Sequence, residues 1–172
     1  GKPLIPERWT DLSTVTISYG HGISTTPLHL ATGYAAIANG GHMVKPTLLK
    51  QTTSQYQDVV FREDVAKDAL HMLREVVSNE DGTASFGEVP GYSVGGKTGS
   101  AEKPKENGGG YYKEKNINTF ASIFPTDNPK YVLVVTLDEP MDTALRYRAV
   151  GHDKCLGLSE RLRGAGAAAR PL

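Results

Sequence analysis

The sequence predicts an α/β fold of the α+β type, in which an antiparallel sheet is flanked by helices. Three extended runs joined by polar, turn-rich connections predict the sheet, because strands that follow one another in this way commonly pair as an antiparallel meander. A stretch with the apolar spacing of a helix, 63–78, predicts the main helix. The 172 residues suffice for a single domain with its own core.

Two helices are predicted from their ends and their apolar spacing. The first begins at Pro27, since Thr26 is a suitable N-cap and proline is favoured at the first helical position. It ends at the glycine-containing segment 39–41. The second runs from about Glu63 to Ser78. The core-facing stripe of this second helix is expected to contain Val65, Ala69, Met72, Leu73 and Val76.

The remaining segments are extended or irregular. Residues 1–26 are polar, with a loop at Gly20 and Gly22, and 43–53 is expected to be a short strand or extended segment. The three runs of the meander then follow. They are 92–101, 118–124 and 131–137, and the last two are separated by a proline- and asparagine-rich turn.

The segment 95–102, GGKTGSAE, is the most informative one for function, and it fits two chemistries. Read from Gly91, it matches the phosphate-loop pattern G-x-x-x-x-G-K-[ST]. Lys97-Thr98-Gly99 is also the K-T-G triplet of penicillin-recognising serine enzymes. A phosphate loop needs a buried strand before it and a helix that begins at the lysine. Because Pro90 precedes the segment and Pro104 follows it, the context favours K-T-G on a strand.

Three blocks that include this triplet occur in an order familiar from one family. They are 18–31 (SYGHGISTTPLHLA), 97–102 (KTGSAE), and 118–121 (NTFA) followed by 132–140. The chain resembles the C-terminal half of the transpeptidase domain of class B penicillin-binding proteins, and among them the division-type enzymes. The resemblance covers about residues 1–140. It implies the serine β-lactamase/transpeptidase-like fold and, for the full-length parent, a serine-type peptidoglycan D,D-transpeptidase.

The resemblance also implies roles for the residues of the K-T-G strand. Lys97 is the expected catalytic residue, supplying positive charge and assisting proton transfer during acylation. The hydroxyls of Thr98 and Ser100 are expected to bind the substrate's terminal carboxylate. Gly99 and Ala101 complete the substrate-binding strand, and the Ser100 N–H is expected to form half of the oxyanion hole. This chemistry needs neither a metal nor an organic cofactor.

Two motifs of the family, the S-x-x-K nucleophile and the S-x-N triplet, need separate comment. No S-x-N occurs in the sequence, and its one S-x-x-K match, Ser100 to Lys103, overlaps the K-T-G strand. A strand places those two side chains on opposite faces, so we interpret the match as coincidental. The nucleophile is expected upstream of Gly1, and the chain by itself is expected to be inactive.

The composition and the family resemblance together indicate which molecules the protein is expected to bind. Acidic and basic residues balance at 19 each, so the whole chain has no net positive charge that would favour nucleic-acid binding. No apolar run approaches the ~20 residues of a membrane-spanning helix. The scattered histidines lack the spacing of metal ligands. The implied partners are peptidoglycan stem peptides, β-lactams and, through the parent, division proteins. The implied location is the extracytoplasmic face of a bacterial inner membrane, with the anchor outside this chain.

Other interpretations stay open. A serine β-lactamase or a β-lactam sensor domain shares K-T-G and the sheet, although the block at 18–31 argues against both. A carboxypeptidase would differ in using water as the acceptor. From another class, the isolated chain would be a catalytically silent structural or protein-binding module.

Residues 141–172 differ in character from 1–140. They are basic and rich in glycine and alanine, and we find no resemblance to the family in them. They are interpreted as a separate tail, either flexible or translated in a shifted reading frame.

Overall fold

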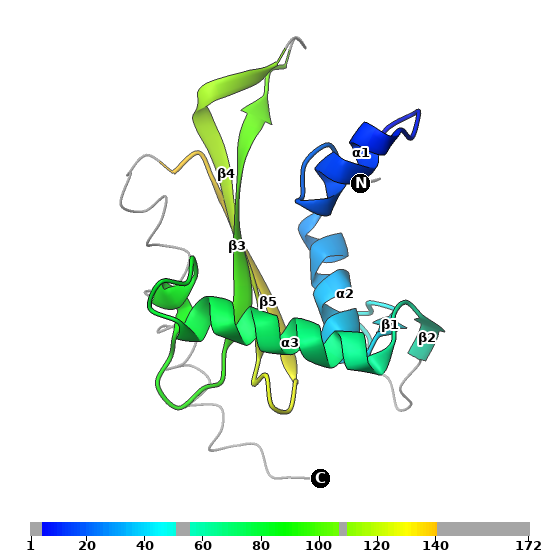
Figure 1. The fold of residues 1–172 in the computed structure, drawn as a ribbon, viewed down its shortest axis with the longest axis vertical. Helices are drawn as coiled ribbons and strands as arrows, with labels where there is room; N and C mark the ends of the chain where they lie inside the picture. The colour runs from blue at the N-terminus through cyan, green and yellow to red at the C-terminus, as the bar shows by residue number, and fades with distance from the viewer. Residues whose placement is uncertain (1–4, 51–55, 107–109, 141–172) are drawn as a thin grey trace.

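A three-stranded antiparallel sheet carries the K-T-G segment. The computed structural model describes residues 5–50, 56–106 and 110–140, so the tail predicted at 141–172 lies outside the described residues. The sheet has the order β3-β4-β5, with β3 at Gly95–Pro104, β4 at Tyr111–Phe124 and β5 at Tyr131–Asp138. This meander, shown in Figure 1, is the one that the sequence predicts, and it confirms the predicted fold class.

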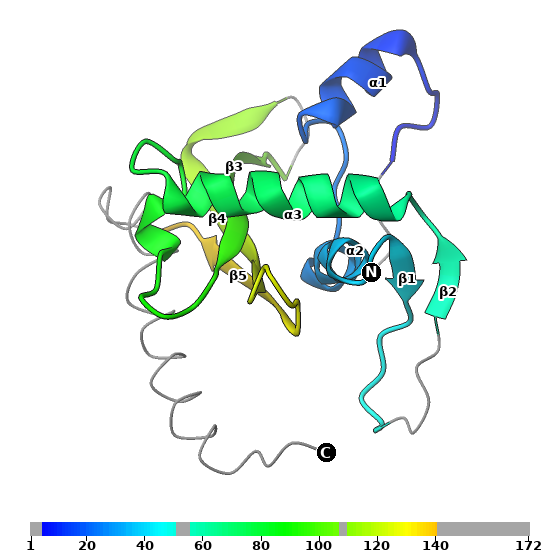
Figure 2. The same cartoon turned by 60° about the horizontal axis from the view of Figure 1, so that its bottom comes forward.

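In the described residues, three α-helices and a second, smaller sheet accompany this meander. The helices are α1 (Asp11–Ser18), α2 (Pro27–Ala38) and α3 (Glu63–Ser78), and the small sheet pairs β1 (His42–Val44) with β2 (Tyr56–Val59). Helices α2 and α3 contact the meander. Figure 2 shows α3 running across β3, with α2 beside it and the β1–β2 pair at its N-terminal end. In the described part of the chain, no helix has the length and apolar character needed to cross a membrane.

The predicted ends of α2 and α3 are confirmed. Thr26 caps α2, because its side chain accepts a hydrogen bond from the His29 backbone N–H while the His29 ring lies 3.4 Å from the Thr26 backbone nitrogen. Asn39 is the C-cap of α2. Acidic residues occupy the first turn of α3, where the helix dipole favours them.

The hydrophobic core lies where the C-terminal half of α3 meets the sheet. It joins Val77 of α3 to Phe120 of β4, with apolar residues from the connection between α3 and β3. That connection contains a short 3-10 helix, η1 (Ser85–Gly87). The buried members of this cluster are Val77, Ala84, Val89, Val94 and Phe120. The start of β3 is therefore attached to the best-packed part of the molecule.

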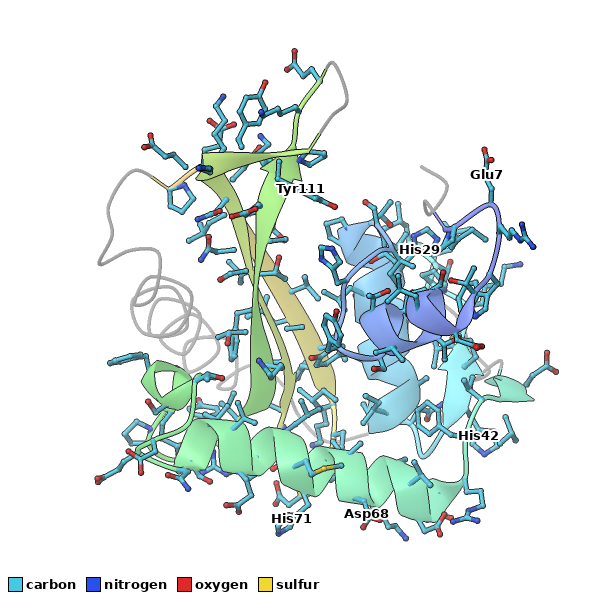
Figure 3. The ribbon with its side chains drawn as sticks, turned by 45° about the horizontal axis from the view of Figure 1, so that its top comes forward. Glu7, His29, His42, Asp68, His71 and Tyr111 are labelled. Atoms are coloured by element: carbon cyan, nitrogen blue, oxygen red, sulfur yellow. The ribbon has the colours of Figure 1, made fainter. Side chains whose placement is uncertain are left out.

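The buried side of α3 matches the predicted stripe only in part: Ala69, Leu73 and Val76 are half-buried, and Val76 packs against the core cluster. Val65 and Met72 are 43% and 61% exposed, so their assignment to the core is wrong. Ala66 and Val77 are buried instead, with Leu70 and Leu73 half-buried between them, and these four keep helical spacing. The predicted and the observed stripes overlap and both are apolar, so periodicity alone does not distinguish the one that faces the sheet. Figure 3 shows Asp68 and His71 on the side of α3 turned away from the sheet.

Three elements were not predicted: α1, β2 and the 3-10 helix η1. Helix α1 lies within the segment expected to be polar and irregular, and none of its residues is buried, so it leaves no core-facing stripe in the sequence. It is stabilised locally by a reciprocal hydrogen-bond pair between Thr10 and Ser13. The loop expected at Gly20 and Gly22 is present, and both glycines have positive φ. Strand β2 is so short and polar that its sequence alone does not distinguish it from a loop.

The turn after α2 gives a test of the fold. Gly41 has φ +92, and an added Cβ would lie 3.0 Å from the Phe61 carbonyl carbon and closer still to its oxygen. Gly41→Ala is therefore expected to lower the free energy of unfolding by at least about 1–2 kcal/mol. The matched control is Gly33→Ala within α2, where an added Cβ meets nothing within 4 Å. That variant should gain about 0.5–1 kcal/mol. Urea denaturation of both variants measures the difference, and equal stabilities would contradict the described turn.

Candidate active site

The residues predicted to form the site lie on β3, the outer strand of the sheet. β3 pairs with β4 on one side, with Lys97 opposite Ala121 and Ser100 opposite Asn118. Among the described residues no strand pairs with its other side. Alternate backbone N–H and C=O groups of β3 therefore face outward, where an extended peptide chain can bind. The strand also places Lys97 at an interior position, so no helix begins there as a phosphate loop would require.

Lys97 and the two hydroxyl residues project from opposite faces of this strand. Lys97 is exposed, and its Nζ donates a hydrogen bond to its neighbour's carbonyl, that of Thr98, at 2.8 Å. Gly99 and Ala101 are also exposed. The strand thus brings the predicted residues 97–101 together on one edge, with the ammonium group at its N-terminal end.

The hydroxyl groups are held by side chains from neighbouring elements. Thr98 Oγ1 lies 3.3 Å from Thr83 Oγ1, in the connection that follows α3. Asn118 Nδ2, on β4, donates to Ser100 Oγ at 3.2 Å, and Asn118 is 4% exposed. Neither Thr83 nor Asn118 was assigned to the site from the sequence, because both contacts depend on pairing between distant segments. Each of the two hydroxyls thus has a hydrogen-bond partner outside β3, and the partner of Ser100 lies opposite it on β4.

The S-x-x-K match is not a catalytic pair in this structure. Lys103 Nζ lies 2.8 Å from Asp138 Oδ1 and 2.8 Å from Glu139 Oε1, at the end of β5. Hydrogen bonds to Asp138 and then Glu139 raise the pKa of Lys103, so it stays a cation. Ser100 is held by Asn118, as described above. The two residues of the match therefore have different partners, which agrees with its interpretation as coincidental.

Two aromatic rings approach each other beyond the C-terminal end of the site. His21, in the loop between α1 and α2, and Tyr111, at the start of β4, have ring centroids 6.0 Å apart. Figure 3 shows Tyr111 on the β3–β4 hairpin, on the side that faces α1 and α2. This contact links the helical part of the chain to the hairpin that carries the site.

The site is an open strand edge, and it is separate from a cavity found elsewhere among the described residues. A cavity of about 460 Å³ is lined by α2, α3 and the β4–β5 turn, and none of the residues 97–101 lines it. Within the described ranges, no group of three or more His, Cys, Asp or Glu side chains is placed to bind a metal ion. Lys97 supplies positive charge at the site, and the side chains of Thr98 and Ser100 supply hydrogen-bonding hydroxyls.

An antiparallel sheet flanked by helices, with K-T-G on its outer strand, is the arrangement of serine β-lactamase/transpeptidase-like proteins. The penicillin binding protein transpeptidase domain family matches residues 2–151, which extends past Pro140. The chain belongs to this family, and its resemblance to class B members is confirmed. It is 35% identical over 150 residues to a probable peptidoglycan D,D-transpeptidase FtsI of Caulobacter vibrioides, covering 83% of this chain and 26% of that protein.

Other proteins similar to this chain are also penicillin-binding proteins or transpeptidases by name. Identity is 33% to a probable peptidoglycan D,D-transpeptidase PenA of Neisseria meningitidis, covering 77% of this chain and 22% of that protein. The transpeptidase domain of Burkholderia pseudomallei penicillin-binding protein 3 superposes with a TM-score of 0.80 at 32% identity, covering 92% of this chain and 49% of that structure. The chain therefore spans about a quarter of the length of these curated relatives and about half of a solved transpeptidase domain.

The Asn118 contact gives a test of the site's geometry. Asn118→Ala removes the buried amide that donates to Ser100 from the paired strand and is expected to lower the free energy of unfolding by about 1 kcal/mol. Asn116→Ala, two residues away on the same strand and less buried, is the control and should stay within about 0.5 kcal/mol of the parent. Chemical denaturation compares the two. Equal losses in both variants would mean that the Asn118 contact has no special role.

Proposed function

We propose that this chain is the C-terminal part of a peptidoglycan D,D-transpeptidase, contributing one wall of an active site whose nucleophile lies outside the chain. The observation that carries the proposal is the exposed outer strand with Lys97, Thr98 and Ser100, in a member of the penicillin-binding transpeptidase family. The names of the relatives favour transpeptidation over the β-lactamase, sensor and carboxypeptidase interpretations.

The reaction is acyl transfer between two stem peptides. A serine hydroxyl attacks the carbonyl between the two terminal D-alanines, the serine–acyl bond forms, and D-alanine leaves with the proton from the hydroxyl. An amine of a neighbouring stem then attacks the acyl-enzyme and restores the serine. Nucleophile, proton transfer and oxyanion stabilisation account for both steps.

Each of the residues 97–101 on this strand has a role in the proposed reaction. Lys97 places positive charge beside the reacting groups and assists the proton transfer. Thr98 and Ser100 bind the carboxylate of the terminal D-alanine through charge-assisted hydrogen bonds. The Ser100 N–H stabilises the oxyanion together with the N–H of the nucleophile itself, and Gly99 and Ala101 leave the strand edge open to the substrate.

β-Lactams are the expected inhibitors, because they mimic the donor peptide and acylate the same serine. Support comes from the solved Mycobacterium tuberculosis penicillin-binding protein 3 complexed with aztreonam, to which this chain is 28% identical with a TM-score of 0.75. In the full-length parent, the reaction belongs to septal cross-linking at the extracytoplasmic face of the inner membrane, in association with division proteins.

Labelling with a fluorescent penicillin tests the proposal. The isolated chain is expected to remain unlabelled, and the full-length protein is expected to be labelled on a serine upstream of this chain. A covalent adduct on Ser100 of the isolated chain would contradict the assignment, and so would a full-length protein that no penicillin labels.

Substitution of the lysine tests its role. In the full-length protein, Lys97→Gln is expected to lower the acylation rate by about 10²–10⁴, the usual contribution of a group that assists proton transfer. Lys113→Gln, an exposed lysine on β4, is the matched control and should acylate at the parent rate. Stopped-flow labelling measures both rates. Acylation of Lys97→Gln at the rate of the control would remove Lys97 from the mechanism.

A further inference from the structure

Ser93 and Val94, the two residues that lead into the K-T-G strand, are held from two sides. Arg74 of α3 donates from Nη1 to the Val94 carbonyl at 2.7 Å. Thr126, just after β4, donates from its backbone N–H to the Ser93 carbonyl at 2.8 Å, and its hydroxyl lies 2.5 Å from the Ser93 hydroxyl. The position of the strand three residues before Lys97 is thus set by contacts to α3 and to the β4–β5 turn.

Arg74 is itself fixed in one orientation. Its guanidinium group makes a two-point pair with Glu88: Nη1 pairs with Oε2, and Nη2 donates to Oε1 at 2.8 Å. The two side chains are 27% and 38% exposed, so solvent screens this pair less than a surface pair. The planar, multi-donor guanidinium can hold a carboxylate and a carbonyl together, which a lysine ammonium does less well. Arg74 therefore connects α3, the segment after η1 and the start of β3.

The backbone of α3 also touches β3 at this residue. A Cβ added to Gly95 would lie 3.0 Å from the Arg74 nitrogen and 3.1 Å from the Leu73 carbonyl carbon. Glycine suits this position because a Cβ would also lie 2.6 Å from the Thr126 Cγ2 atom, so the strand is enclosed by the helix and by the β4–β5 turn. Backbone contact at Gly95 sets the distance between α3 and β3, and the guanidinium contact at Val94 sets the position of β3 along the helix.

We propose that Arg74, held by Glu88, is a positioning residue for the K-T-G strand, fixing where Lys97 and the Ser100 N–H stand relative to the nucleophile. This inference rests on the proposed function. Arg74 touches none of the residues 97–101 and acts through the Val94 carbonyl. Catalysis is sensitive to such positioning, because a misplacement of about 1 Å can cost about 10²-fold in rate.

Acylation kinetics of the full-length protein test the inference. Stopped-flow labelling with fluorescent penicillin separates the non-covalent dissociation constant from the first-order acylation rate, and saturating label counts the folded, competent fraction. Arg74→Gln is expected to lower the acylation rate of that competent fraction by about tenfold to 10²-fold. Arg74→Lys, which keeps the charge, should recover only part of the loss.

The control is another arginine of the same helix region. Arg62 makes a two-point pair with Asp64 but is far more exposed, with 78% of its side chain accessible, and this pair is separate from the start of β3. Arg62→Gln should acylate at the parent rate. A merely structural role for Arg74 would lower the melting temperature and the competent fraction in Arg74→Gln, and would leave the acylation rate of the competent fraction unchanged.

The outcomes separate this inference from the proposed function. A parent protein that penicillin does not acylate contradicts the proposed function itself. A parent that is acylated, with Arg74→Gln equal to Arg62→Gln in acylation rate, overturns the positioning role alone. Should Arg74→Gln fail to fold, Glu88→Gln replaces it: Arg74 stays, but its two-point ion pair is lost, so the guanidinium and the Val94 carbonyl that it binds are positioned less firmly. Its acylation rate is expected to fall about threefold to tenfold as part of the same displacement, and a rate equal to that of Arg62→Gln would overturn the inference.

Discussion

The pairing of β3 with β4 is the constraint on which the rest of the structure depends. β4 is the central strand, and its residues 120–123 are all buried, so its position is fixed by the core. β3 takes its register from β4 and keeps its outer edge open among the described residues. Pairing thereby fixes the inner edge of β3, the outer edge presents backbone groups, and the Lys97 side chain projects from one face of the strand. Lys97, Thr98 and Ser100 can hold fixed positions toward a bound peptide because one edge of β3 is paired and the other, in the described part of the chain, is open.

Both ends of β3 are anchored by ion pairs, and the predicted site lies between them. At its start, Arg74 donates a hydrogen bond to the Val94 carbonyl and is itself held by its ion pair with Glu88. At its far end, Lys103 binds Asp138 and Glu139 at the end of β5. The hydrogen bond from Lys103 lowers the pKa of Glu139, so this second anchor is charged near neutral pH. The stretch 97–101 crosses the interval between the anchors, where a peptide can bind without competing for either pair.

The sequence predicts local features well and long-range contacts poorly. The bounds of α2 and α3 follow from Thr26, Pro27 and the acidic first turn of α3, since caps and dipole preferences act within a few residues. The K-T-G strand follows from glycines and prolines that exclude a helix. By contrast, β4 begins at Tyr111, well before the expected start at Asn118, because its polar first half is stabilised by pairing with β3. Thr83, Asn118 and Arg74 were missed for the same reason.

Hydrogen exchange at the Ser100 backbone amide tests whether the outer edge of β3 forms a wall of the active site. In the full-length protein, the backbone amide of Ser100 is measured before and after acylation by a penicillin, at single-residue resolution by mass spectrometry with electron-transfer fragmentation. The account predicts a free amide that exchanges readily and becomes strongly protected once the acyl carbonyl oxygen occupies the oxyanion hole. An amide that is already protected in the free protein, or unchanged after full acylation, would contradict the assignment of this strand edge as the wall of the active site.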